Sequence, residues 1–267
     1  MMRFVRHHVL TAYAALALAY LFLPIVIVVA FSFNNPAGRF NYTWQGFTFA
    51  NWTNPFGYPG LSGALKVSVE IALLSALFAT ALGTLIALAL VRYSFRGSAT
   101  TNLLIFIPMT TPEVVMGASL LTLFLNWKIP QGFGTILIAH ILFNISYVVV
   151  TVRARLVGFD RHLEEAAMDL GANELVTFWR VTLPLIMPGI LAAGLLAFAL
   201  SIDDFVITYF NAGATTTFPL FVWGAARVAL PAQINVIGTA IFVIAVAGML
   251  ANIFVQNLRT RKGAVAA

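Results

Sequence analysis

The sequence predicts an all-α integral membrane protein with six transmembrane helices in a single domain, residues 1–267. Of its 267 residues, 61% are hydrophobic and only 9% are charged, whereas a soluble domain carries about a quarter charged residues. Six apolar blocks are long enough to cross a bilayer at about 1.5 Å of rise per residue. Between the fourth and fifth blocks lies a polar, acid-bearing segment, residues 153–188. These features indicate a protein built for lipid, with one substantial polar element outside the membrane.

The first block is longer than the core of a signal peptide and lacks a small-residue cleavage site, so we expect it to be retained. Cytoplasmic loops are enriched in lysine and arginine. Eleven of these residues fall on the side that carries both termini and segment 153–188, and four fall on the other, so both termini are predicted to be cytoplasmic. The predicted spans are Val9–Phe33, Leu65–Val91, Leu103–Leu125, Gly134–Val152, Gly189–Phe210 and Asn235–Gln256. The eleven are Arg3, Arg6, Arg92, Arg96, Arg153, Arg155, Arg161, Arg180, Arg259, Arg261 and Lys262, and the four are Arg39, Lys66, Lys128 and Arg227.

The outer loop between the first two spans interleaves aromatic residues with glycine, proline and asparagine. This composition suits a loop that lies along the lipid headgroups. An interfacial anchor and a docking surface for an external protein both remain open. The aromatic residues are Phe40, Tyr42, Trp44, Phe47, Phe49, Trp52, Phe56 and Tyr58.

The second and third spans contain acidic residues, which are costly inside a bilayer and usually line a pathway. Glu70 lies four residues after Lys66, so a local ion pair and a lining role are both open. Glu113 follows Pro108 and Pro112, and prolines break backbone hydrogen bonds and bend a helix. A structural hinge and a substrate-lining position are both open there.

The fourth span contains His140, which we interpret as a packed histidine that bonds a neighbouring helix. His7 and His8 are expected to face headgroups. The chain has no cysteine, no clustered metal ligands and no nucleophile motif, so we expect neither a metal site nor catalysis. No lysine follows a glycine, so a P-loop is excluded and any ATP must be bound elsewhere. The basic residues are scattered singly, which argues against nucleic-acid binding.

The polar segment is predicted to form two short helices. Gly171 follows the first helix, where a left-handed residue is expected. Asn173 can cap the second helix, Pro184 is predicted to stop it, and Pro188 suits the start of the fifth span. In the first helix the apolar residues Leu163, Ala166, Ala167 and Leu170 and the acidic residues Glu164, Glu165 and Asp169 fall mostly on different faces.

This helix pair has two possible roles. Connections of about 36 residues are usually functional or disordered, and this one is well capped. Its small alanines would let another surface approach closely. A docking element for a soluble partner and a plain connector between spans both remain open.

The fifth span contains Asp203 and Asp204, whose side chains would diverge by about 100° around a helix. One is expected to face a central pore, and the other to bond a neighbouring helix or a facing subunit. No basic residue is placed at mid-depth to pair with them or with Glu113. An uncompensated acidic lining favours a cationic substrate.

The spacing of Glu165-Ala166-Ala167, Gly171 and Val181-Thr182-Leu183-Pro184 resembles the EAA signature of ABC-importer permease subunits, with Val181 in place of the more usual isoleucine. The resemblance covers nearly the whole chain in span order and loop sizes. It implies the type I ABC-importer permease (MetI-like) fold, with coupling helices that insert into a groove on a nucleotide-binding subunit. The candidate coupling residues are Glu164, Glu165, Ala166, Ala167, Asp169, Gly171, Leu183 and Pro184.

Further motifs resemble the spermidine/putrescine-type branch of this family, and EEAAMDLGA resembles its putrescine members. The resemblance implies a bacterial inner-membrane subunit that imports polyamines with a homologous permease, two ABC ATPases and an external polyamine-binding protein. The motifs are SFN at Ser32–Asn34, WQGF at Trp44–Phe47, RYSFRG at Arg92–Gly97, SIDDFVITYF at Ser201–Phe210 and TTTFPL at Thr215–Leu220. The candidate pathway residues are Asp203, Asp204, Glu113 and Glu70.

Three other functions stay open. An importer of the same class could carry another small solute, such as an opine or iron. A secondary carrier or channel would work without any ATPase. A purely structural subunit would only assemble the complex.

Overall fold

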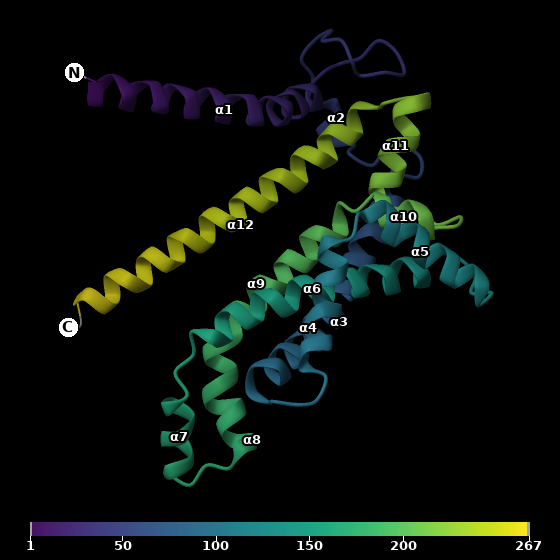
Figure 1. Ribbon diagram of the computed structural model, residues 1–267. Coiled ribbons are helices and arrows are strands. Elements are labelled where there is room, and N and C mark those ends of the chain that lie inside the picture. The colour runs from purple at the N-terminus through teal and green to yellow at the C-terminus, as the bar shows by residue number, and fades with distance from the viewer. Residues whose placement is uncertain (1, 266–267) are drawn as a thin grey trace. The chain divides into compact units, whose positions relative to one another are not determined.

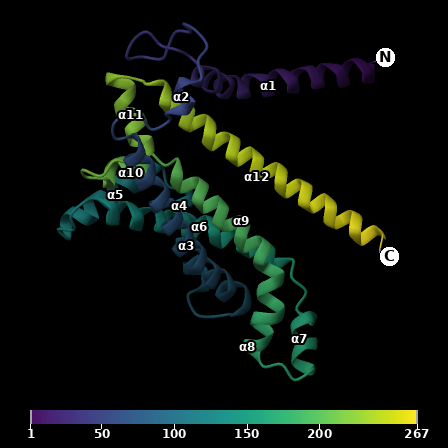
Figure 2. The ribbon, with the colours of Figure 1, turned by 180° about the vertical axis from the view of Figure 1, so that it is seen from behind.

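The computed structural model describes the backbone of residues 2–265 and the side chains of residues 9–250. In that part of the chain the regular structure is helical, apart from two isolated β-bridges. Figures 1 and 2 show the helices from opposite sides. The chain divides into two compact units, Met1–Leu61 with Val222–Ala267, and Ser62–Phe221. The all-α fold class is confirmed, and the single domain stays a prediction.

The first unit contains α1 (Met2–Ser32), α2 (Ala50–Thr53) and α12 (Ala232–Val265). Both α1 and α2 pack against α12. Asparagine side chains order the loop after α1, because their amides bond backbone groups that no helix satisfies. Asn34 donates to Asn41 Oδ1 at 2.6 Å and accepts from the Gln45 N–H at 2.8 Å. Asn51 donates to the carbonyls of Ser32 and Asn34 at 3.1 and 2.7 Å.

The aromatic residues of this loop are partly stacked and largely exposed. The ring of Phe33 stacks on those of Phe47 and Trp52, with centroids 5.5 Å apart in each pair. Phe47 and Phe49 nevertheless keep 62% and 61% of their surface exposed. Exposed rings suit either a headgroup anchor or a docking surface, so both roles stay predictions.

The second unit begins with α3 (Leu61–Arg92) and ends within α11 (Phe218–Val228), which continues into the first unit. Among its helices, α6 packs most extensively against α9 and also contacts α4, while α10 packs against α5. The remaining elements are α4 (Ser98–Thr110), α5 (Glu113–Asn126), α6 (Phe133–Val157), α7 (His162–Asp169), α8 (Glu174–Thr177), the π-helical turn η1 (Phe178–Thr182), α9 (Leu183–Ile202) and α10 (Val206–Asn211).

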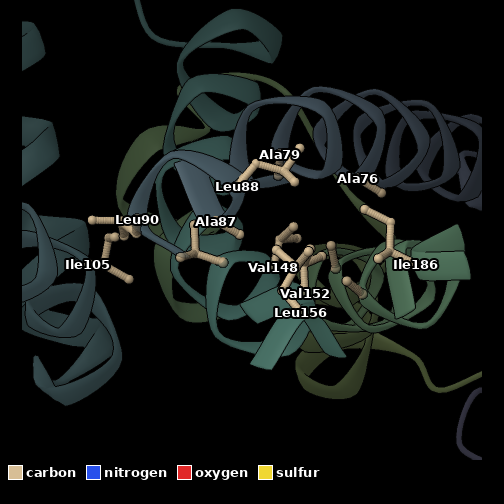
Figure 3. Close-up of a cluster of buried hydrophobic side chains, with 13 residues drawn as sticks. Ala76, Ala79, Ala87, Leu88, Leu90, Ile105, Val148, Val152, Leu156 and Ile186 are labelled. Carbon is tan, nitrogen blue, oxygen red and sulfur yellow. The ribbon is translucent and has the colours of Figure 1, made fainter. Parts of the chain in front are cut away.

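Small residues let α3, α6 and α9 approach closely. Figure 3 shows Val148 and Val152 of α6 between alanines of α3 and Ile186 of α9. A Cβ added at Gly83 of α3 would lie 2.6 Å from Val148 Cγ1, so only glycine fits that contact. Lipid gives helices little hydrophobic reason to associate, so close packing of small residues is a main source of helix–helix stability in a membrane.

Among the described residues, five helical stretches are long and apolar enough to cross a membrane, and the pair α4 and α5, bent by 110°, makes six if it counts as one span. The predicted number of spans is confirmed on that count, whereas the bounds of the fifth differ from the prediction. The five are Val9–Ser32, Leu61–Arg92, Phe133–Val157, Glu174–Ile202 and Ala232–Leu250. The side chains of Arg3, Arg6, His7, His8, Arg259, Arg261 and Lys262, and of 251–256 in the predicted last span, lie outside the described residues.

Candidate functional site

The first helix of the polar segment, α7, ends at a left-handed glycine. Gly171 has a φ of +92°. Its N–H donates to the carbonyl of Met168 at 2.9 Å, and the N–H of Ala172 donates to that of Ala167 at 3.1 Å. These two bonds are the pattern of a Schellman cap. The prediction for Gly171 is confirmed.

The second helix begins as predicted, because Asn173 Oδ1 accepts the N–H of Val176 at 2.8 Å. The prediction that Pro184 stops this helix is wrong. Helical structure runs without a break from Glu174 to Ile202, so the fifth span starts well before the predicted Gly189.

The π-helical turn η1 explains how the helix passes Pro184. Proline has no N–H, and its ring crowds the carbonyl four residues earlier in an α-helix. Directly before Pro184, the N–H of Leu183 donates to the carbonyl of Phe178, five residues back. This wider turn shifts the hydrogen-bond register just before the proline, so the helix continues. Pro188, predicted to begin the span, lies inside α9.

Glu164 attaches α7 to the end of α3. Its carboxylate accepts hydrogen bonds from the guanidinium of Arg92 and the hydroxyl of Thr182. Nearby, Arg161 donates to the carbonyl of Val91 at 3.0 Å. The side chains of Arg92 and Glu164 are 27% and 15% exposed, so the ion pair is largely shielded from water. The segment is therefore fixed at the end of α3 by a charge-assisted network.

The sequence pattern grouped Glu164 with Glu165 and Asp169, and the structure separates them. Glu164 turns inward, whereas Glu165 and Asp169 are exposed. Glu165 bonds only the exposed His162 next to it, at 3.1 Å. The sequence reasoning missed Arg92 and Thr182 as partners of Glu164. They lie 72 and 18 residues from it in the sequence, and no local spacing rule predicts contacts at such separations.

The outer surface of the segment is unusually apolar for a polar loop. Leu170 is 90% exposed, Leu175 69% and Trp179 60%. Clustered exposed apolar side chains usually mark a site of interaction. We call this surface the apolar face; it comprises Leu163, Met168, Leu170, Leu175, Val176 and Trp179. Of the other candidate coupling residues, Ala166, Gly171 and Pro184 are exposed, and Ala167 and Leu183 are half-buried.

Glu70 and Glu113, two of the four candidate pathway acids, lie on helices other than the two that flank Asp203 and Asp204. Glu70 pairs with Lys66 at 3.8 Å, which confirms the local ion pair. Glu113 is the first residue of α5 and is exposed directly after the bend at Thr111 and Pro112. The bend predicted from the prolines is confirmed, whereas a hinge and a lining role for Glu113 both stay predictions.

Asp204 is part of a buried network centred on His140. The imidazole Nδ1 is 2.6 Å from Ser201 Oγ, and Nε2 is 3.2 Å from Asp204 Oδ2 and 2.9 Å from Thr208 Oγ1. Ser75 of α3 donates to Ser201 at 2.9 Å. The prediction that His140 bonds a neighbouring helix is confirmed. Helix packing also brings His140 to Asp204 as a hydrogen-bond partner, a contact that the sequence reasoning missed.

The two aspartates lie at a helix break. α9 ends at Ile202 and α10 begins at Val206, so the prediction of a continuous span from Gly189 to Phe210 is wrong. Asp203 is exposed, whereas the Asp204 side chain is only 6% exposed. In the described part of the chain, no group of three or more histidine and acidic side chains could hold a metal ion.

A family model described as "Binding-protein-dependent transport system inner membrane component" matches residues 79–263. The chain is 38% identical over 244 residues to the "Spermidine/putrescine transport system permease protein PotC" of Escherichia coli (strain K12), covering 91% of this chain and 92% of that protein. It is also 38% identical over 234 residues to the "Putrescine transport system permease protein PotI" of the same strain, covering 85% and 83%.

Solved structures share the fold at low sequence identity. A chain of a bacterial ABC transporter involved in the import of the acidic polysaccharide alginate matches with a TM-score of 0.68 and 16% identity, covering 93% of this chain and 96% of that one. A bacterial alginate ABC transporter in complex with a pentasaccharide-bound periplasmic protein matches with a TM-score of 0.61 and 17% identity, covering 92% and 93%. These likenesses establish the fold.

Proposed function

This chain belongs to the family of binding-protein-dependent transport system inner membrane components, and from that premise we propose that it is the permease subunit of an ATP-driven importer of polyamines such as putrescine and spermidine. One observation carries the proposal: the 38% identity to a spermidine/putrescine permease extends over 91% of the chain. The protein is a multi-pass transport subunit of the inner membrane and not an enzyme.

The polar segment is the site where a soluble ATPase subunit docks. Its apolar face is exposed in the described part of the chain, and burying such side chains would stabilise a complex by about 1.5–3 kcal/mol each. Glu165, Ala166 and Gly171 are exposed as well. Glu164 has a different task, since its bonds to Arg92 and Thr182 transmit movement of α7 to α3 and to η1, which continues into α9.

The remaining partners follow from this assignment. A homologous permease completes the pathway, two ABC ATPases bind and hydrolyse ATP, and an external polyamine-binding protein delivers the cargo. The polar segment and both termini lie in the cytoplasm. The shared network of Arg92 and Arg161 with α7 supports this orientation, because it gathers basic residues beside the segment.

Exposed carboxylates at helix breaks are the cargo contacts. Glu113 and Asp203 each lie beside an interruption in a span, where backbone groups and acids can face a water-filled path. Protonated amines carry the complementary charge. Glu70 lies at the outer end of α3 and is partly neutralised by Lys66.

Reconstitution of the complete importer in proteoliposomes tests the proposal. We expect uptake of radiolabelled putrescine that requires ATP on the ATPase side and the loaded binding protein on the opposite side. An ATPase variant that lacks its phosphate-binding lysine should abolish uptake. Transport of putrescine by this chain alone would contradict the assignment, as would a complete complex that imports only an uncharged or anionic solute.

A further inference from the structure

The His140 network connects four helices of the second unit at one buried point. Ser75 comes from α3, His140 from α6 and Ser201 from the last turn of α9, while Thr208 lies in α10. The side chain of His140 is 3% exposed. A buried polar group is stable only when its hydrogen bonds are satisfied, so the network fixes where these helices meet.

One arrangement of hydrogens satisfies the network. A carboxylate only accepts, so the ring nitrogen that faces Asp204, Nε2, must carry a proton. In the neutral ring Nδ1 is then the acceptor for the hydroxyl of Ser201, which in turn accepts from that of Ser75. Asp204 Oδ2 also accepts from the N–H and the hydroxyl of Thr208, each at 2.8 Å. The Asp204 carboxylate is thus fully engaged within the chain.

Asp203 differs from Asp204 in its exposure and in its bonding. Its side chain is exposed, and among the described residues it forms no ion pair. It occupies the C-cap position of α9, which is the first residue of the three-residue break before α10. Both ends of that break are held by His140, through Ser201 on one side and Asp204 with Thr208 on the other.

We propose that His140 is a positioning residue, which fixes the break after α9 so that Asp203, and not Asp204, presents its carboxylate to the cationic cargo. This inference rests on the proposed function. Asp204 supplies a buried acceptor that orders the start of α10. The two adjacent acids therefore have separate tasks, one in folding and one in transport, and the cargo they imply carries an ammonium group.

Substitution of each aspartate in the complete importer separates these tasks. We expect Asp203→Asn to lower putrescine uptake at least tenfold with an unchanged yield of assembled complex, and Asp203→Glu to restore most of the uptake. Asp204→Ala should lower the yield itself, because it removes the carboxylate oxygen that accepts from the N–H and the hydroxyl of Thr208 and from Nε2 of His140.

The role of His140 is tested by substituting it with Gln or Asn, each of which keeps a polar group near only one of the two ring nitrogens. Gln places an amide donor near Nε2, and Asn places its amide near Nδ1, so His140→Gln should retain more uptake than His140→Asn. In a His140→Ala background, Asp203→Asn should lower uptake less than threefold, because Asp203 is no longer held in place. A purely structural histidine would instead leave the tenfold effect of Asp203→Asn intact.

The outcomes distinguish the inference from the proposed function. If the wild-type importer takes up no putrescine, the proposed function fails, and this inference fails with it. If the wild-type importer is active and Asp203→Asn is equally active, the inference alone is overturned. It is also overturned if the Asp204→Ala complex assembles in normal yield. The same holds if the fold-losses of uptake caused by His140→Ala and Asp203→Asn multiply in the double variant.

Discussion

Replacing Glu164 by alanine should detach α7 from the end of α3. Hydrogen bonds to charged groups contribute about 1.5–3 kcal/mol each, and removing one partner leaves the other unsatisfied. Arg92 is 27% exposed, so water replaces part of what the carboxylate provided. We therefore expect a loss of about 2 kcal/mol in local stability. At 1.4 kcal/mol per factor of ten, this raises the population of the detached segment roughly 30-fold.

Hydrogen exchange followed by mass spectrometry measures this population directly, in the importer held in lipid nanodiscs. Amides of residues 163–182 should exchange about 30-fold faster in Glu164→Ala, while amides of α6 keep their protection. The neighbouring Glu165→Ala is the matched control, because its side chain is 62% exposed and bonds only an exposed histidine. That change should alter exchange by less than about threefold.

Two results would refute this reasoning. One is equal exchange of residues 163–182 in Glu164→Ala and in the wild type. The other concerns the double variant with Arg92→Ala, which should be little worse than either single variant, since both remove the same interaction. Fully additive losses would show that Glu164 and Arg92 act separately.

Three further changes test the packing, the turn and the apolar face. Gly83→Leu should lower the yield of folded protein through about 1–3 kcal/mol of overpacking against Val148, as measured by size-exclusion chromatography. Gly63 has open space around it, so Gly63→Leu should leave the yield unchanged. Equal yields of the two variants would contradict the contact between Gly83 and Val148. Gly171→Ala should destabilise the segment by about 1 kcal/mol in hydrogen exchange, because an alanine is strained at a φ of +92°, and unchanged exchange would contradict this. Leu170→Ser should weaken ATPase co-purification about tenfold at normal folded yield, and undiminished binding would place the ATPase elsewhere.

Features that depend on neighbours in the sequence could be predicted well. The number of spans follows from hydropathy over about twenty residues, and the caps at Gly171 and Asn173 follow from backbone rules within one turn. The pair of Glu70 with Lys66 is likewise a local helical contact. Each of these is decided within a few residues, so the sequence alone contains the information.

Features that depend on tertiary packing could not be predicted. Glu164 meets Arg92 across 72 residues, and His140 meets Asp204 across 64. The two residues of each pair are brought together by helix packing and not by local helix geometry, so their separation in the sequence follows no rule. Pro184 was misjudged for another reason. Proline stops a regular α-helix, and the sequence offered no sign that a π turn would shift the hydrogen-bond register before it.

The unbroken helix from Glu174 to Ile202 has a mechanical consequence. Its 29 residues connect the polar segment to Asp203 without a loop between them. The helix is continuous but bent, since α8 and α9 run in different directions in Figure 1 and the stretch contains the π-helical turn η1 and Pro188. Under the proposed function, movement of the ATPase at the base of this helix would reach Asp203 through the backbone itself. Had Pro184 ended the helix, a flexible loop would have absorbed part of that movement.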